Sequence, residues 1–252
     1  AIFSFYLFEF FLIINSGYLK KHFFFDDRTR YEIYIDEKKI NQDTIVSTNP
    51  IFFKFDYNIN YYPLSGISKF NTINCNENGY YAKYMSDRYG YNNKDKLWDL
   101  DEYSFVLTGD SYAHGACVNY PNALSDVISS LSKKNIINLG LSGNGPLLQY
   151  AVLKEFFNYK KAKNIIFLYY EDNDLSELQE EIKHPILKKY FDDENFFQNI
   201  FKNQHKTNTI IKVKFNDTLN VLKKNKEDGF MIPSFFKLQN TRKFLLKISG
   251  DK

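Results

Sequence analysis

Residues 103–118 constrain the fold of this chain more than any other stretch, because an apolar run stops abruptly there. The run at 105–107 is typical of a buried strand, and Gly109 breaks it. Asp110 or Ser111 can then cap a following helix. The pattern predicts that Ser111 lies on a sharp strand-to-helix turn at the carboxyl edge of a sheet, beside free helix N–H groups. This geometry suits a nucleophile.

Helices and strands are expected to alternate after this turn. Apolar periodicity predicts a helix, a strand, a long amphipathic helix and another strand over residues 123–131, 135–139, 147–159 and 164–170. This alternation is typical of a parallel sheet with helices on both faces. Function in such sheets gathers where strands end, and Ser111, Gly143 and Asn173 all follow predicted strands.

Three short motifs in this region resemble the sequence blocks of the SGNH (GDSL) hydrolase family. Gly109-Asp110-Ser111, followed by Gly115, is similar to the first block. Ser142-Gly143 is similar to the second block, and Asn173-Asp174 to the third. The resemblance covers roughly residues 103–175. It departs from the family at Asp172, which stands where the third block has a glycine.

The resemblance implies a three-layer α/β/α fold with a parallel, flavodoxin-like sheet. It also implies a serine esterase that forms an acyl-enzyme on Ser111. The oxyanion would be held by the amides of Ser111 and Gly143 and by the side chain of Asn173, with Asn144 as the alternative donor. Asp110 and His114 are further candidates for the pocket. No metal or organic cofactor is implied.

Ser111 needs a base to remove its proton, and the sequence leaves that base open. His114 lies three positions after Ser111 and would share a helix face with it, so it is an alternative base or a pocket residue. Glu181-Ile182-Lys183-His184 imitates an acid-x-x-His spacing, but we expect His184 at the surface. The resemblance implies an Asp-x-x-His block near the C-terminus, which we expect beyond Lys252.

The N-terminal part is expected to precede the α/β domain as two further segments. Residues 1–14 are apolar except for Glu9, and predict a partial signal-anchor or transmembrane segment over 1–20, or else a buried helix. Residues 21–100 are expected to form a β-rich lead-in, with strands at 31–35 and 52–57. The α/β domain then spans 101–252. These features favour a membrane-anchored protein of the cell envelope, periplasmic or extracellular.

Only two cysteines are present, and they allow two interpretations. Cys75 and Cys117 can form one disulfide in an exported protein, or they can remain two buried free thiols. We favour the free thiols slightly, because the sequence says nothing about the distance between them. His22 lies near Asp26 and Asp27, but this cluster is expected to be solvated rather than to bind metal.

Charge and motifs together narrow the expected function. The net charge of +3 and the absence of a dense Lys/Arg stripe give nucleic-acid binding little support. The expected activity is that of a serine esterase or acyl hydrolase acting on an acyl ester or an O-acylated carbohydrate. Two alternatives remain: an O-acyltransferase of envelope polysaccharide, or a non-catalytic protein that binds a carbohydrate or a partner.

Overall fold

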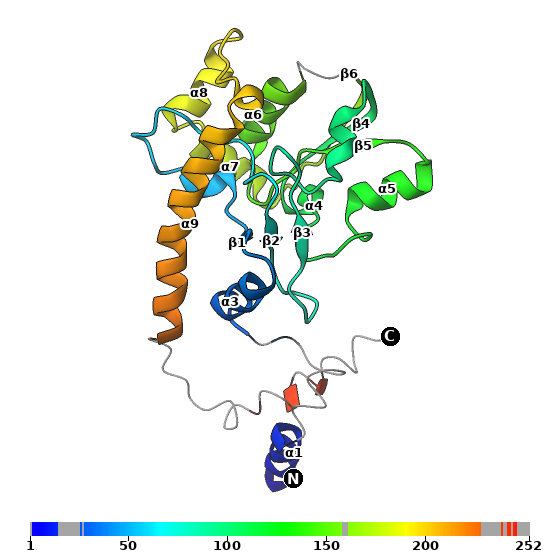
Figure 1. Cartoon of the computed structure of the whole chain (residues 1–252), viewed down its shortest axis with the longest axis vertical. Coiled ribbons are helices and arrows are strands. Elements are labelled where there is room, and N and C mark those ends of the chain that lie inside the picture. Colours follow the sequence, from blue (N-terminus) through cyan, green and yellow to red (C-terminus); the bar gives the residue numbers. More distant parts are fainter. Residues whose placement is uncertain are drawn as a thin grey trace.

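The computed structural model describes residues 2–14, 26, 28–157 and 161–227, together with the single positions 238, 241, 242, 244 and 245. Figure 1 shows the main body of the protein, with the long helix α9 (Gln204–Glu227) running down one side of it. Helix α1 (Ile2–Ile14) lies apart from the body, at one end of the view. Two sheets lie within the body, and both are small.

The sheet that carries the candidate site is parallel, as predicted. Strand β4 (Glu102–Thr108) lies at its centre, between β5 (Ile136–Asn138) and β6 (Lys161–Phe167). Helix α5 (Leu124–Ser132) connects β4 to β5, and helix α6 (Pro146–Phe157) connects β5 to β6. The mixed α/β class is therefore confirmed for the described residues. The strand at 164–170 begins and ends about three residues earlier than expected.

Both faces of this sheet are covered at β4 and β5, whereas Ile165 and Phe167 of the edge strand β6 are exposed. Val106 and Ile137 belong to a large core that also contains apolar side chains of α6. Leu107 follows Val106 along β4, and Ile136 precedes Ile137 along β5. Both belong to a second cluster, which packs against α5. Because successive side chains of a strand point to opposite faces, the helices of the two crossovers cover opposite sides of the sheet.

The prediction of a strand at 31–35 is wrong. These residues lie in helix α3 (Arg30–Ile40). Thr29 and Glu32 form a capping box, in which each side chain accepts a hydrogen bond from the other residue's backbone N–H. The capping box satisfies N–H groups that would otherwise lack partners at the helix start, and this stabilises the helix against the strand pattern.

The rest of the lead-in is also less β-rich than expected. Residues 52–57 are not a strand, because Pro50 starts a 3-10 helix, η1 (Pro50–Phe53), and turns follow it. The second sheet has three strands of three residues each: β1 (Thr44–Val46), β2 (Asn71–Ile73) and β3 (Lys83–Met85). β1 and β2 are parallel, whereas β2 and β3 are antiparallel. A 3-10 helix, η2 (Asp95–Asp99), precedes β4.

The lead-in and the α/β part share one hydrophobic core. Ile45 and Tyr62 of the lead-in lie in the same cluster of buried side chains as Leu148 and Phe156 of α6. Helices α7 (Asp174–Glu181) and α8 (Pro185–Asp192), the 3-10 helix η3 (Ile200–Lys202) and α9 follow the sheet. Side chains of α8, η3 and α9 extend this core. The predicted boundary near residue 100 is therefore crossed by continuous apolar packing.

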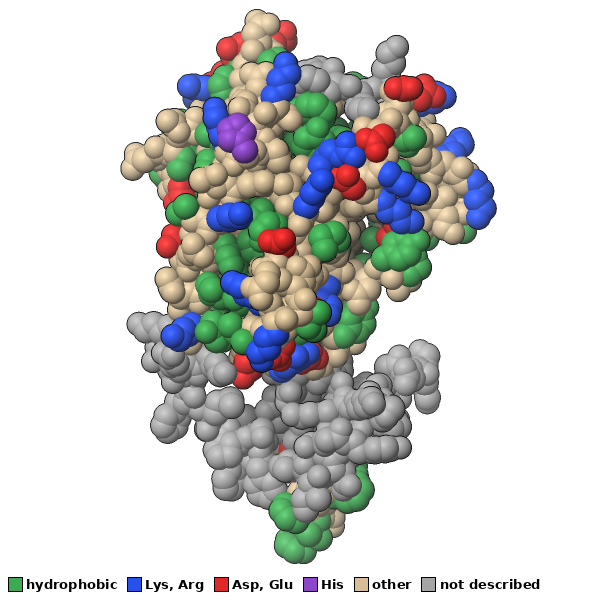
Figure 2. Space-filling view, viewed as in Figure 1, with side chains coloured by type: hydrophobic (Ala, Val, Ile, Leu, Met, Phe, Trp, Pro, Cys, Tyr) green, Lys and Arg blue, Asp and Glu red, His purple; other side chains and the backbone are tan. Residues whose placement is uncertain are grey.

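Helix α1 exposes most of its aromatic side chains. Phe3, Phe5 and Phe10 are exposed, whereas Glu9 is buried and accepts hydrogen bonds from the backbone N–H and hydroxyl of Thr241. Among the described residues, no helix combines the length and the apolar character needed to cross a membrane. Figure 2 shows Lys and Arg side chains interspersed with Asp and Glu over the face in view.

Candidate functional site

The serine turn has the predicted form. Asp110 is the N-cap of helix α4 (Ser111–His114), and its carboxylate accepts a hydrogen bond of 3.1 Å from the N–H of Tyr112. A side chain on Gly109 would approach the Cβ of Leu168 to 2.9 Å, so glycine allows β4 and β6 to lie close at the turn. Ser111 is half-buried at the first position of this one-turn helix.

Two hollows meet at Ser111. The first, which we call the glycine-loop pocket, has a volume of about 340 Å³ and is lined by residues that include Arg30, Asn49, Ile51, Ser111 and Gly143. The second, which we call the tyrosine pocket, has a volume of about 510 Å³ and is lined by residues that include Ser111, Tyr112, Asn122, Leu124, Tyr170 and Asn173. A substrate bound across Ser111 can therefore extend to either side of it.

Gly143 lines the glycine-loop pocket together with Ser111. Its φ of +79° is in the left-handed region that favours glycine. A Cβ at this position would lie 2.9 Å from a methyl carbon of Ile51. The lead-in therefore packs directly on the loop that carries the candidate oxyanion donor.

The two candidate asparagines occupy different environments. Asn173 is half-buried, lines the tyrosine pocket with Ser111, and donates one hydrogen bond of 3.2 Å to the carboxylate of Glu177. Its amide nitrogen carries two hydrogens, so one remains available for an oxyanion. Asn144 is fully buried and lines neither pocket, and its side-chain nitrogen and oxygen have no hydrogen-bond partner among the residues described. Asn173 is therefore better placed to reach a substrate.

His114 supports the glycine loop. Its Nδ1 lies 2.9 Å from the hydroxyl of Ser142 and accepts a hydrogen bond of 3.3 Å from the Ser142 N–H, and its Nε2 lies 2.9 Å from the hydroxyl of Tyr84. Burial lowers the pKa of His114 to about 4, so the imidazole is neutral at physiological pH. Both ring nitrogens are engaged away from Ser111, which gives the alternative of His114 as the base no support.

The other histidines also lie away from Ser111. His184 is fully buried, so the expectation of a surface position is wrong. It caps α8 by accepting the N–H of Ile186, and its ring packs edge-on against Tyr62. His205 is exposed on α9, and His22 lies outside the described residues. Within the described part of the chain, the Ser111 hydroxyl has one hydrogen-bond partner, the carboxylate of Asp110, at 3.4 Å.

Acidic side chains surround Asn173. Burial raises the pKa of Asp174, and the carboxylate of Asp110 adds to this effect. Burial likewise raises the pKa of Glu177, with further contributions from Asp174 and Asp110. Asp172, which replaces the glycine of the family motif, is exposed and accepts a hydrogen bond of 3.5 Å from the hydroxyl of Tyr170. Its charge is therefore screened by solvent.

Glu181 anchors the end of the glycine loop. Its fully buried carboxylate accepts hydrogen bonds from the N–H groups of Gly145, Leu147 and Leu148, at 2.7, 2.9 and 3.2 Å. These groups belong to the start of α6 and the residue before it, so Glu181 satisfies N–H groups that the helix leaves unpaired. Burial raises the pKa of Glu181 from 4.5 to about 7, although the three hydrogen bonds oppose this shift.

We expect the Glu181→Gln variant to change how stability depends on pH. Because the pKa of Glu181 is higher in the folded chain, its contribution to stability is fully present below about pH 4.5 and is lost as the pH rises through about 7. The free energy of unfolding of the unmodified chain should therefore fall across this window by about 3 kcal/mol more than that of the variant. Urea denaturation from pH 4.5 to 8 measures this. Parallel curves for the two proteins would contradict it.

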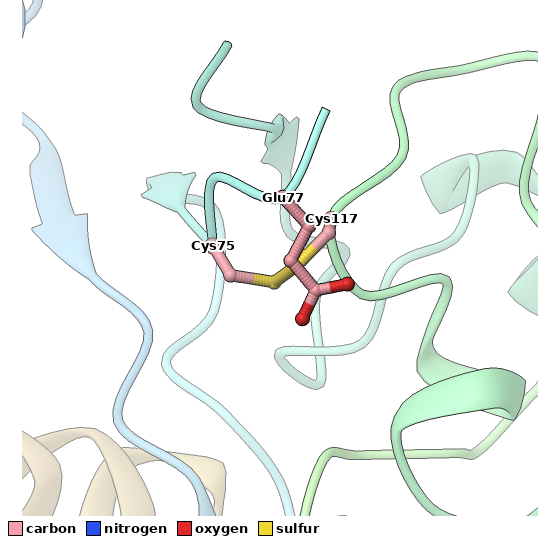
Figure 3. Close-up of side chains that lie close together, drawn as sticks. All are labelled: Cys75, Glu77 and Cys117. Atoms are coloured by element: carbon pink, nitrogen blue, oxygen red, sulfur yellow. A yellow bond between two sulfur atoms is a disulfide. The ribbon is translucent and has the colours of Figure 1, made fainter. Parts of the chain in front are cut away.

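Cys75 and Cys117 form a disulfide, so the preference for two free thiols is wrong. The bond connects the segment after β2 to the segment after α4. Figure 3 shows Glu77 lying against it. The two sulfur atoms and the Glu77 carboxylate lie within 4.8 Å of one another, but the sulfurs are bonded to each other and offer no thiolate to a metal. Cys75 lines the glycine-loop pocket, and Cys117 lines the tyrosine pocket.

Several residues of the site are not found by the sequence argument. The lead-in residues Arg30 and Ile51 reach the glycine-loop pocket through long-range packing, for which the sequence carries no signal. Glu181 also acts at long range. The sequence does contain a signal for Tyr112 and Tyr170. Tyr112 directly follows the serine, and Tyr170 comes three residues after the end of β6. Because strand ends converge in a parallel sheet, both could have been expected near Ser111.

No family model matches the chain, and no curated protein or solved structure matches it either. The functional evidence therefore lies in the site itself, because a fold alone does not define an activity. The site places the serine at the junction of two pockets, with Gly143 in one pocket and Asn173 in the other.

Proposed function

We propose that this protein is a serine esterase of the SGNH type, which forms an acyl-enzyme on Ser111. The observation that carries the proposal is the position of Ser111, on a strand-to-helix turn where a pocket containing Gly143 meets a pocket containing Asn173. A nucleophile that shares one pocket with each of two potential oxyanion donors supports acyl transfer, which also needs a base.

The strand order supports an SGNH-type, three-layer fold. Order β5-β4-β6 corresponds to the first three strands of the flavodoxin-like order 2-1-3, in which a ligand crevice opens between strands 1 and 3. Ser111 follows β4 and Asn173 follows β6, so both lie at that crevice. The packing of α6 and α5 against opposite faces of β4 and β5 is consistent with helical layers on each side.

The reaction would proceed in two acyl-transfer steps. In the first, the Ser111 oxygen forms a bond to the acyl carbon while a base removes its proton; the bond to the leaving oxygen then breaks, and that oxygen takes the proton. In the second, water attacks the acyl carbon, the bond to Ser111 breaks, and the serine regains a proton. The N–H groups of Ser111 and Gly143 and the amide of Asn173 would stabilise the oxyanion in both steps.

The proposal requires a base from outside the described residues, because no histidine within them contacts Ser111. The Asp110 carboxylate is the partner that the structure gives to the serine hydroxyl, at 3.4 Å. It also caps α4 through the Tyr112 N–H, so its first role is to fix the turn. We propose that a histidine supplies the base, as the resemblance implies.

A fluorophosphonate probe tests the proposal directly. A protein that contains this chain together with its base should form a covalent adduct with the probe, and peptide mass spectrometry should place that adduct on Ser111. If the folded protein gives no adduct while a known serine esterase in the same tube does, the non-catalytic binding protein becomes the better reading. If an adduct forms and acyl groups pass to an added polyol rather than to water, the protein is an O-acyltransferase.

We also propose that the protein is exported and associated with a membrane. The exposed Phe3, Leu7 and Phe10 lie on one face of α1 and form an apolar surface of the kind that contacts lipid, and the disulfide is typical of oxidising compartments. Fractionation of producing cells should place the chain with membranes, and replacing these three residues by serine should release it. Recovery of the unmodified chain from the cytosol with reduced thiols would contradict this.

A further inference from the structure

The tyrosine pocket has an aromatic wall beside the reacting serine. Tyr112 and Tyr170 are 61% and 39% exposed, and their rings meet edge to face with centroids 5.4 Å apart. Tyr112 is the residue directly after Ser111, and both tyrosines line the pocket with it. Exposed aromatic rings at the mouth of a pocket are available to a ligand rather than to the core.

Polar groups face the same hollow. The amide of Asn122 and the carboxylate of Glu77 line the pocket, are exposed, and have no hydrogen-bond partner among the residues that the structure describes. An alkyl chain could make no hydrogen bond to these groups, which would have to keep water as their partner. A sugar ring presents C–H groups on its face and hydroxyls at its edge, so it can stack on an aromatic ring and hydrogen-bond to the amide and carboxylate at once.

The charge of the pocket restricts the kind of sugar. Glu77 and Asp110 line it, and the described residues of its lining include no Lys or Arg. A uronate or a phosphorylated sugar would bring a negative charge next to these carboxylates, which is unfavourable. Arg30 lies in the glycine-loop pocket, on the other side of Ser111.

We propose that the tyrosine pocket holds an uncharged sugar ring, stacked on Tyr112, and so places the ester of that sugar at Ser111. This inference rests on the proposed esterase function and names its substrate class. Tyr112 is then a specificity-determining residue. It binds the alcohol part of the substrate and takes no part in the chemistry.

The test compares two ester substrates with and without a sugar. For Tyr112→Ala, we expect KM for an O-acetyl methyl glucoside to rise about tenfold, because the sugar loses a stacking contact. The rate of vinyl acetate hydrolysis should change less than about twofold. Tyr112→Phe keeps the ring and should behave as the unmodified protein. Tyr150→Ala, which removes an exposed tyrosine from α6 outside the pocket, is the matched control.

Three results would overturn the proposal. An equal loss of activity on both substrates would show that Tyr112 has a structural role. An unchanged KM for the glucoside would show that the sugar does not stack on Tyr112. Faster hydrolysis of the matching O-acetyl glucuronate would contradict the charge argument. Saturation-transfer NMR with methyl glucoside separates this proposal from the esterase activity: binding that Tyr112→Ala abolishes supports the sugar site even in a protein that hydrolyses nothing, and the absence of binding refutes it.

Discussion

Replacing Ser111 with alanine is expected to lower esterase activity by roughly four orders of magnitude or more, because the acyl-enzyme can no longer form. The hydroxyl has a single hydrogen bond in the described part of the chain, and that bond is long, at 3.4 Å. Stability should therefore change little. Initial rates of vinyl acetate hydrolysis and a thermal denaturation curve measure the two quantities.

The control for this variant is Ser130→Ala, which removes an exposed hydroxyl from α5 outside both pockets. It should retain full activity. A Ser111→Ala protein that stays folded and hydrolyses esters as fast as the unmodified chain would refute Ser111 as the nucleophile. If the Ser111→Ala protein does not fold, the Ser111→Cys variant is tested in its place. Its thiol should react with iodoacetamide if the side chain is accessible.

Replacing Asn173 with alanine is expected to lower kcat about 10²- to 10³-fold, the usual effect of removing one oxyanion donor. KM should change little, because the lost hydrogen bond forms mainly in the transition state. Asn144→Ala should cost far less, since Asn144 is fully buried and lines neither pocket. Steady-state kinetics of the two variants on one ester decides between the two candidate donors.

Asn173→Asp provides a sharper control, because it keeps the shape of the side chain and replaces the donor with an acceptor. Glu177 would then face a second carboxylate where it now accepts a hydrogen bond of 3.2 Å. The activity of Asn173→Asp should be as low as that of Asn173→Ala. The assignment fails if Asn144→Ala loses more activity than Asn173→Ala while both proteins stay folded.

The parts of the site that are local in sequence could be predicted. The serine turn follows from an apolar strand, a glycine and a capping carboxylate within a few residues, and the structure has all three. The placement of Gly143 and Asn173 at strand ends follows from the alternation of strands and helices. These features depend on neighbouring residues, whose preferences a single sequence records.

The parts of the site that depend on distant residues could not be predicted from the sequence. The error at 31–35 is different in kind, because the capping box of Thr29 and Glu32 is a local helix signal that the alternation outweighed. The packing of Ile51 on Gly143 and the hydrogen bonds of Glu181 to the start of α6 join segments far apart in the chain. Such contacts depend on the final arrangement of elements, which periodicity does not encode.

The bond between Cys75 and Cys117 sets the order in which the site can be completed. Cys75 is synthesised 42 residues before Cys117, so the bond closes only after the serine turn has left the ribosome. A reducing cytoplasm keeps the two thiols reduced. Protein made there, or stored with a thiol reductant, has its two pocket walls joined by non-covalent packing alone. Material folded under oxidising conditions is therefore the proper starting point for every assay of this serine.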